Sequence, residues 1–144
     1  MLERRVTLIT LGVSDLARAR AFYAALGWRE TGEPQPGVAF YQLLGQALAL
    51  YPLADLARDQ GRALTPGSGA VTLAQNVASA AAVDALHAAA LAAGAAQVTA
   101  PAPTQWGGYV GYFADPDGHV WEVAHASMLP LGADRSLTLP GAAA

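Results

Sequence analysis

The chain has 144 residues, which suits one compact domain, and its 53% hydrophobic content is raised by alanine, a residue that buries little area. A net charge of −3 with only 13% charged residues provides no basic surface to neutralise phosphates, so we expect no nucleic-acid partner. The lack of cysteine excludes disulfides, thiolate nucleophiles and cysteine-bound zinc, and no secretory leader or membrane-spanning segment is visible, so we expect a cytoplasmic protein that does not enter a membrane.

The first part of the chain has the pattern of a strand, a helix and three further strands. Aliphatic and β-branched residues predict a strand over Arg5–Val13, after which Ser14-Asp15 offers a helix N-cap. Gly27 is placed to end that helix. The apolar stripe of the helix is formed by Leu16, Ala19, Tyr23 and Leu26. Turn residues then separate three expected strands, at Trp28–Glu33, Val38–Leu43 and Ala47–Pro52.

A linker rich in polar and turn residues is expected over Leu53–Ser68, and after it the same order of elements returns. Gly69–Gln75 is predicted to be a strand, and Ser79–Ala93 an alanine-rich helix that ends at Gly94. Three more strands are expected at Gln97–Ala100, Tyr109–Ala114 and His119–His125.

This repetition predicts an α+β fold made of two βαβββ units, at about residues 4–53 and 68–126. Both units belong to one domain over residues 1–126, and we expect their sheets to surround a shared cleft. Residues 127–144 form a C-terminal tail, which is too rich in proline and glycine to be a core helix. Within the tail, Ser136–Leu139 is the candidate for a short strand.

Two motifs stand at opposite ends of this duplicated pattern. The residues from Asp115 to Val123 read Asp-Pro-Asp-Gly-His-Val-Trp-Glu-Val, and the residues from Leu11 to Leu16 are followed by Phe22-Tyr23 and Leu26-Gly27-Trp28. These motifs resemble the last hairpin and the first strand, helix and strand of the vicinal oxygen chelate superfamily, which includes glyoxalases, bleomycin-resistance proteins and extradiol dioxygenases. The resemblance covers roughly residues 4–125 and implies a glyoxalase-like open barrel.

Metal-dependent members of that superfamily hold a divalent ion with four ligands, and the resemblance places these positions at Leu8, Ala49, Ala70 and Glu122. Only Glu122 has a side chain that can coordinate a metal, whereas such a site normally needs three or four converging ligands. Strand alternation also puts His119 and His125 on the face opposite to Glu122, so this strand adds no second ligand. We therefore expect no metal site and no cofactor.

Glu122 is the main candidate for ligand binding and, if the protein is catalytic, the only candidate for that role. The alternative is a carboxylate held by a neighbouring tyrosine or backbone group. Hairpin register decides whether Tyr109 or Tyr112 faces the cleft, and Tyr109 is preferred. The other candidate ligand-binding residues are Thr10, Thr72, Tyr51 and Trp106, for which structural hydroxyls and aromatic core packing are the alternatives.

The remaining acidic and histidine residues have simpler interpretations. Asp115 and Asp117 are expected to be turn residues, while His119 and His125 are expected at the surface or in a dimer interface. Gly107-Gly108 follows a proline-rich loop and does not form a nucleotide-binding motif.

The leading hypothesis is therefore a metal-free superfamily member that binds a small organic molecule in an aromatic-sided cleft. Two alternatives stay open. One is a metal-dependent glyoxalase-like lyase or isomerase, or an extradiol-type dioxygenase, which would use a divalent metal. The other is a resistance protein that sequesters a drug. We expect a homodimer, because the sheet edge beside Gln97–Ala100 is a liability if it stays bare.

Overall fold

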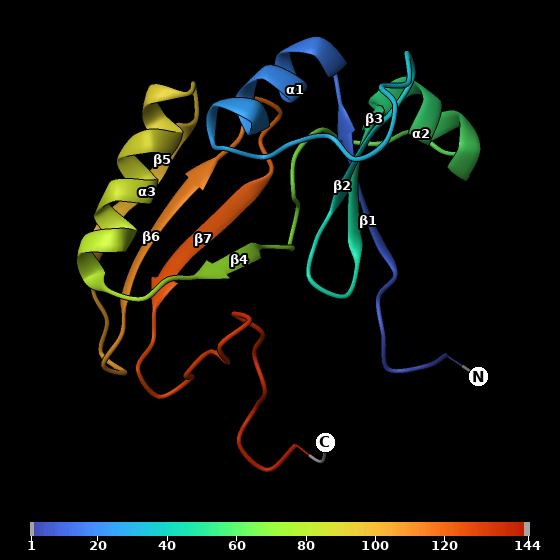
Figure 1. Cartoon of the computed structure of the whole chain (residues 1–144). Coiled ribbons are helices and arrows are strands. Elements are labelled where there is room, and N and C mark those ends of the chain that lie inside the picture. The colour runs from blue at the N-terminus through green and yellow to red at the C-terminus, as the bar shows by residue number, and fades with distance from the viewer. Residues whose placement is uncertain (1, 143–144) are drawn as a thin grey trace. The chain divides into compact units, whose positions relative to one another are not determined.

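The computed structural model describes residues 2–142 and divides into two compact units, each with its own β-sheet (Figure 1). Unit 1 comprises the described residues up to Ala70 together with Asp115–His119, and unit 2 comprises Val71–Ala114 and the residues from Val120 onward. Helices and strands of both units confirm the expected α+β class. Among the described residues, no helix combines the length and the apolar character needed to cross a bilayer.

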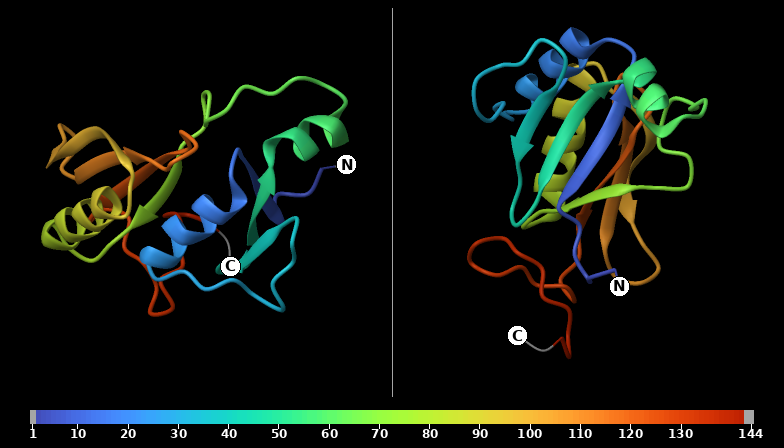
Figure 2. Two further views of the ribbon diagram at one scale, coloured as in Figure 1. Left: turned by 90° about the horizontal axis from the view of Figure 1, so that it is seen from above. Right: turned by 90° about the vertical axis from the view of Figure 1, so that its right-hand side faces the viewer.

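The sheet of unit 1 has three strands in the order β1-β3-β2 (Figure 2, right). β1 (Leu8–Val13) runs parallel to β3 (Ala47–Pro52), and β2 (Ala39–Gln42) runs antiparallel to it. Helix α1 (Leu16–Ala25) packs on one face of this sheet, where the Tyr23 ring lies 6.1 Å from the ring of Tyr41. Leu48 and Leu50 are fully buried and complete the apolar core of the unit.

The ends of α1 lie where the sequence predicts them. The Asp15 side chain accepts a hydrogen bond from the backbone N–H of Arg18 at 3.0 Å, which satisfies one of the free donors of the first turn. Gly27 has a φ of +89°, the left-handed conformation that ends a helix at little cost only in glycine.

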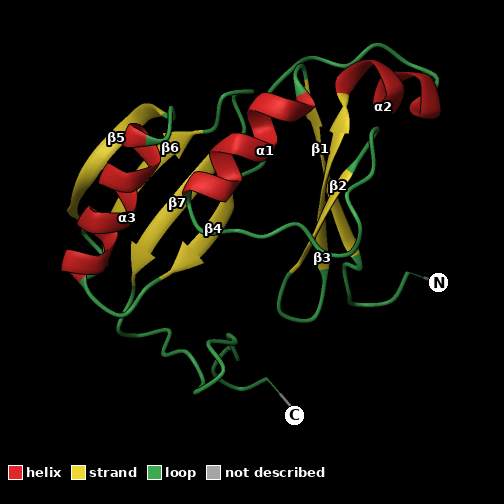
Figure 3. Cartoon of the chain, turned by 45° about the horizontal axis from the view of Figure 1, so that its top comes forward, coloured by secondary structure: helices red, strands yellow, loops and turns green. Residues whose placement is uncertain are grey.

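The expected strand at Trp28–Glu33 is wrong, because this segment is a loop (Figure 3). Side-chain contacts hold this loop, and it does not form the backbone hydrogen bonds of a strand pair. The Trp28 ring packs 5.5 Å from that of Tyr41, and Arg20 binds both carboxylate oxygens of Glu30. Thr31 donates one backbone hydrogen bond to Phe40 at 2.7 Å, a contact that does not extend into a ladder.

The expected linker at Leu53–Ser68 is also wrong in its first half, where α2 (Leu53–Gln60) forms a helix (Figure 3). Leu53 and Leu56 approach Gly12 of β1, on the face of the sheet opposite to α1. Gly61 closes α2 with a φ of +66°. Short amphipathic helices are hard to recognise when only one turn of apolar residues faces the core, and the polar residues of this segment hide the pattern.

The sheet of unit 2 has four strands in the order β4-β7-β6-β5. β4 (Leu73–Asn76) is parallel to β7 (Val120–His125), and β6 (Tyr109–Ala114) lies antiparallel between β7 and β5 (Ala96–Pro103). The extents of β6 and of α3 (Ala80–Ala92) agree with expectation, and the hydroxyl of Ser79 caps α3. β4 starts four residues later than predicted, because Gly69 adopts a φ of +58° that is not compatible with a strand.

Helix α3 covers one face of the unit 2 sheet. Its His87 ring lies 6.4 Å from the ring of Phe113 and would be 3.2 Å from a Cβ placed on Gly111. In an antiparallel sheet, directly opposed residues share a face, so Val123 and Trp121 lie on the α3 side together with Gly111 and Phe113. Val123 and Trp121 are accordingly buried.

The C-terminal tail has less regular structure than expected. Ser136–Leu139 is not a strand, since only a single bridge forms there, between Leu131 and Leu137. Asp134 and Gly132 turn the chain between the two leucines, and Ser136 donates to the Asp134 carboxylate from both its N–H and its hydroxyl. The last two residues of the predicted tail, 143–144, lie outside the described residues.

Candidate functional site

Glu122 lies near the middle of β7, on the face of the unit 2 sheet that α3 does not cover. Its Cα is paired with that of Ala74 in β4 on one side and with that of Tyr112 in β6 on the other. The Tyr112 hydroxyl donates a 2.6 Å hydrogen bond to Oε2 of Glu122. Thr99 of β5 is paired with Tyr112 and extends this row of side chains to the sheet edge.

The hydrogen bond changes the acid–base properties of Tyr112. Its pKa is raised above the ordinary value of 10.0, mainly because the neutral phenol donates to the Glu122 carboxylate and also because it is partly desolvated. The phenol therefore remains a donor throughout the neutral range. Oε1 of Glu122 receives no hydrogen bond from the described residues, and both residues are only half-buried, so this oxygen can accept a donor from a bound molecule.

The register identifies Tyr112, not the preferred Tyr109, as the tyrosine on the face of Glu122. Tyr109 is paired with His125 and therefore lies on the α3 side. There its hydroxyl donates to Asp84 of α3 at 2.9 Å. The signal for this register was present in the sequence. Asp115 and His119 pair across the Asp-Pro-Asp-Gly turn, and counting outward from that pair places Tyr112 opposite Glu122.

The other candidate ligand-binding residues are spread over both units. In unit 1, Thr10 is paired with Ala49, and the Tyr51 hydroxyl donates to Asp59 of α2 at 3.0 Å. In unit 2, Thr72 is exposed just before β4, and Trp106 is 54% exposed in the loop between β5 and β6. The Trp106 ring folds back over Gly108, where any Cβ would collide with it. Among these candidates, Tyr112 and Glu122 are the two that a hydrogen bond connects directly.

The two acidic residues of the Asp-Pro-Asp-Gly turn are buried, and their carboxylates accept hydrogen bonds from groups of the turn itself and of the β1–α1 region. Asp115 accepts hydrogen bonds from the backbone N–H groups of Asp117 and His119 and from the Tyr23 hydroxyl, the last at 2.7 Å. Asp117 accepts from the N–H and the hydroxyl of Ser14, both at 2.8 Å. The turn interpretation is therefore confirmed, and its side chains also fix the junction between β1 and α1.

The surface interpretation of His119 is wrong, because this residue is only 6% exposed. Its Nε2 lies 2.8 Å from the carbonyl oxygen of Gly12, which can only accept, so Nε2 carries the proton. His125 is half-buried, and its Nδ1 lies 3.1 Å from the carbonyl oxygen of Val77.

The residues at the metal positions do not fit a divalent ion. Leu8, Ala49 and Ala70 have no donor atoms in their side chains, and Ala70 lies in a turn before β4. Within residues 2–142, no three His, Asp or Glu side chains are gathered in a way that could hold a metal. The expected cleft shared by the two units stays a prediction.

Comparisons with known proteins agree with this architecture. The family model described as Glyoxalase/Bleomycin resistance protein/Dioxygenase superfamily matches residues 5–123. No curated protein matches the chain. A solved structure of a glyoxalase-related enzyme from Fulvimarina pelagi is 37% identical, with a TM-score of 0.89, over 95% of this chain and 99% of the other.

Two further solved structures extend the comparison. A glyoxalase/bleomycin resistance protein/dioxygenase from Nocardioides is 26% identical, with a TM-score of 0.70, over 87% of this chain and 85% of its own. A lactoylglutathione lyase from Agrobacterium tumefaciens is 21% identical, with a TM-score of 0.66, over 87% of this chain and 96% of its own, and shares the fold alone. By its sequence and its fold, the chain belongs to the Glyoxalase/Bleomycin resistance protein/Dioxygenase superfamily.

Proposed function

We propose that the protein binds a small organic molecule on the face of the unit 2 sheet opposite to α3, without using a metal ion. The observation that carries this proposal is the Tyr112–Glu122 pair, in which one carboxylate oxygen is engaged at 2.6 Å and the other is available. A half-buried carboxylate of this kind favours a ligand with an N–H or O–H donor, because charge-assisted hydrogen bonds are stronger than neutral ones. The phenol ring beside it offers an apolar surface to the rest of the ligand.

Binding without a metal is supported by the side chains at the metal positions. A single carboxylate would have to hold a divalent ion alone, since Leu8, Ala49 and Ala70 supply nothing. Protein sites for such ions normally use several converging ligands. Glu122 is therefore better suited to contact the organic ligand directly than to hold a metal for it.

A second candidate function is catalysis, which is favoured by the name of the 37% identical relative, a glyoxalase-related enzyme. This candidate predicts metal-dependent turnover of hemithioacetals or catechols, and Glu122→Gln would abolish that turnover. The proposed metal-free binding predicts no such turnover, with or without added metal.

Thermal-shift measurements with matched aromatic probes test the binding proposal. Benzylamine, benzyl alcohol and catechol have donors for Glu122, whereas benzoate has a negative charge that the Glu122 carboxylate repels. A ligand at about 100 times its dissociation constant stabilises a protein by about 2.7 kcal/mol. We expect at least one donor probe to raise the melting temperature, and we expect Glu122→Gln to remove this rise while the exposed control Glu33→Gln preserves it. Equal shifts in both variants, or no shift with any donor probe, would contradict ligand binding at Glu122.

Metal content is measured separately. The protein is dialysed after incubation with zinc, nickel or manganese, and the bound metal is then quantified. We expect no stoichiometric metal. One tightly bound ion per chain would refute the metal-free part of the proposal, while the probe titrations would still report on Glu122.

The proposal includes a cytoplasmic homodimer. The absence of cysteine suits a reducing compartment, and β5 is an edge strand within the unit 2 sheet. Light scattering during size-exclusion chromatography distinguishes a dimer from a monomer, and a monomeric mass would refute this part.

A further inference from the structure

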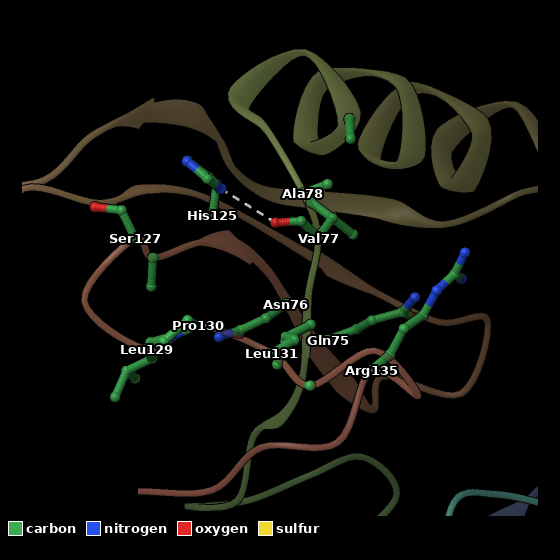
Figure 4. A pocket seen from close by; sticks show the side chains of 13 residues that line it. Gln75, Asn76, Val77, Ala78, His125, Ser127, Leu129, Pro130, Leu131 and Arg135 are labelled. Atoms are coloured by element: carbon green, nitrogen blue, oxygen red, sulfur yellow. Dashed lines mark hydrogen bonds between the residues drawn. The ribbon is translucent and has the colours of Figure 1, made fainter. Parts of the chain in front are cut away.

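A pocket of about 600 Å³ lies in unit 2, at the ends of β4 and β7 (Figure 4). It is formed where β4 leads into α3 and where β7 leads into the C-terminal tail. Neither Tyr112 nor Glu122 lines it. Most of its lining residues follow Val123, the last residue matched by the family model, so the tail builds much of this pocket. The volume falls within the range of ligand-binding cavities, about 300–1,000 Å³.

The charged and polar groups of the pocket favour an anion. Arg135 is the only residue of the lining with a permanent charge, and the lining contains no aspartate or glutamate. The Arg135 side chain is exposed and makes no hydrogen bond or ion pair with the described residues. Gln75 adds a side-chain amide donor, whereas Asn76 is on the opposite face of β4 and its amide points the other way in Figure 4. In Figure 4 the guanidinium of Arg135 and the amide of Gln75 project in the same direction.

A defined turn of the tail fixes the backbone of Arg135. Gly132 accepts a hydrogen bond from the Arg135 N–H at 2.8 Å and donates one to Ser136 at 2.9 Å. Arg135 has a φ of +68°, within a turn closed by the bridge between Leu131 and Leu137. The neighbouring Asp134 carboxylate binds the N–H and hydroxyl of Ser136, at 2.9 and 2.6 Å, and does not pair with Arg135. The guanidinium is therefore left for an external anion.

The rest of the lining is apolar. Leu129, Pro130 and Leu131 come from the tail, Ala78 comes from the segment before α3, and Ala82 comes from the first turn of α3. An inorganic anion would leave these surfaces in contact with water, whereas an organic acid would cover them with its carbon skeleton. Guanidinium groups bind carboxylates through two parallel hydrogen bonds, which fixes the orientation of such a ligand.

We infer that this pocket is a second binding site, specific for a small organic carboxylate whose acid group pairs with Arg135 and whose apolar part contacts the tail. The site is independent of the proposed function at Glu122, and the two sites prefer ligands of opposite character. Glu122 favours donors, and Arg135 favours an acid.

Titration of ¹⁵N-labelled protein, followed by amide chemical shifts, tests this site. The probes are benzoate and hexanoate, their neutral analogues benzamide and hexanamide, and inorganic phosphate. We expect at least one carboxylate to shift the amides of Gln75, Asn76 and Arg135 saturably, and to bind about tenfold or more tightly than its amide, because a charge-assisted pair is lost in the amide. Arg135→Gln should weaken the carboxylate by a similar factor. Arg29→Gln removes another exposed arginine, in unit 1, and should leave carboxylate binding unchanged.

Each contrary result overturns a defined part of the inference. Equal binding of carboxylate and amide, equal binding by Arg135→Gln and the parent protein, or no binding of either carboxylate would overturn the site. Phosphate that binds as tightly as benzoate in an Arg135-dependent way would overturn the specificity for organic acids. Glu122→Gln should not alter carboxylate binding, so failure at Arg135 and failure at Glu122 are distinguishable.

Discussion

Tyr112 and Glu122 are directly opposed in the pairing of β6 with β7, and the tyrosine hydroxyl donates to the glutamate at 2.6 Å. A cross-strand pair of this kind orients both side chains on one face of a sheet. It leaves the second carboxylate oxygen of Glu122 well positioned to accept a hydrogen bond. This relationship is the basis of the proposed binding function, and it has a measurable consequence for pH.

The first prediction concerns the alkaline stability of the protein. The folded-state pKa of Tyr112 is raised above 10.0, because its neutral form donates to the Glu122 carboxylate. The stability that this hydrogen bond contributes is therefore fully present below the unfolded pKa and is lost as the pH rises through the folded pKa. We expect Tyr112→Phe to be less stable than the parent protein at neutral pH, and we expect this difference to shrink as the pH rises above 10.0.

Urea unfolding at a series of pH values measures that difference. Glu122→Gln is the matched control, since it replaces the carboxylate that accepts the tyrosine hydrogen bond and so raises the tyrosine pKa, and in this background ultraviolet titration should show Tyr112 ionising at lower pH. A stability difference that stays constant from neutral to alkaline pH would contradict the hydrogen bond.

A second prediction separates hydrogen bonding from charge pairing at Asp117. The Asp117 side chain is 3% exposed and accepts two hydrogen bonds from Ser14, while its partner Arg18 is 49% exposed. Removing a buried acceptor from its donors costs about 1–3 kcal/mol, whereas exposed ion pairs contribute about 0–1 kcal/mol. Asp117→Ala should therefore lower the free energy of unfolding more than Arg18→Ala. If Arg18→Ala proves equally destabilising in urea unfolding, the charge pair is the dominant interaction.

A third prediction concerns the helix caps. The Ser79 hydroxyl accepts a hydrogen bond from the N–H of Ala82 at 3.1 Å at the start of α3. Loss of such a cap typically costs about 1 kcal/mol, so Ser79→Ala should lower stability by about that amount. Ser79→Asp preserves an acceptor and should leave stability nearly unchanged. Thermal unfolding of both variants checks this, and equal melting temperatures for the two would exclude a capping role.

Those caps also show which features the sequence could predict. The N-cap signal at Ser14-Asp15 and the terminal glycines Gly27 and Gly94 are local signals that depend on a few neighbouring residues, and both helices occur where these signals place them. The strands β3 and β6 were also predicted with their correct ends, because the turn residues beside them bound a short apolar run.

The errors occur where contacts distant in the sequence decide the structure. Trp28–Glu33 has the residues of a strand, but the Trp28 ring and the Arg20–Glu30 pair hold it as a loop. α2 depends on Leu53 and Leu56 meeting the one residue of β1 that lacks a side chain, Gly12. Tertiary contacts override local propensity in both places.

The candidate site was predicted only in part, because the partner of Glu122 is also set by contacts between residues that are distant in the sequence. Glu122 was identified from the motif that contains it, but its partner depends on strand register, and a shift of one residue exchanges the two faces of a strand. Tyr109 was preferred without fixing the hairpin register, whereas the pairing of Asp115 with His119 places Tyr112 beside Glu122. The pocket at Arg135 was not predicted, because it depends on how an irregular tail folds.

The last prediction compares two glycines in close contact with other elements. A Cβ on Gly111 would lie 2.8 Å from Cγ of Pro101 and 3.2 Å from its Cα, so it would meet a rigid ring and the backbone of β5. A Cβ on Gly12 would lie 2.8 Å from Cδ1 of Leu53, the end of a flexible side chain that can change rotamer. Gly111→Ala should therefore cost about 1–3 kcal/mol, as overpacking does, and Gly12→Ala should cost less.

Double variants test the assigned contacts directly. Leu53→Ala should remove most of the additional cost of Gly12→Ala, since neighbouring substitutions that share a contact are not additive. Pro101→Ala should likewise recover part of the stability lost in Gly111→Ala, but only part, because the backbone of β5 remains close to the new methyl group. Thermal unfolding of the four single and two double variants gives both coupling energies. Additive costs in the Gly12 and Leu53 pair would show that α2 does not rest on β1 at this position.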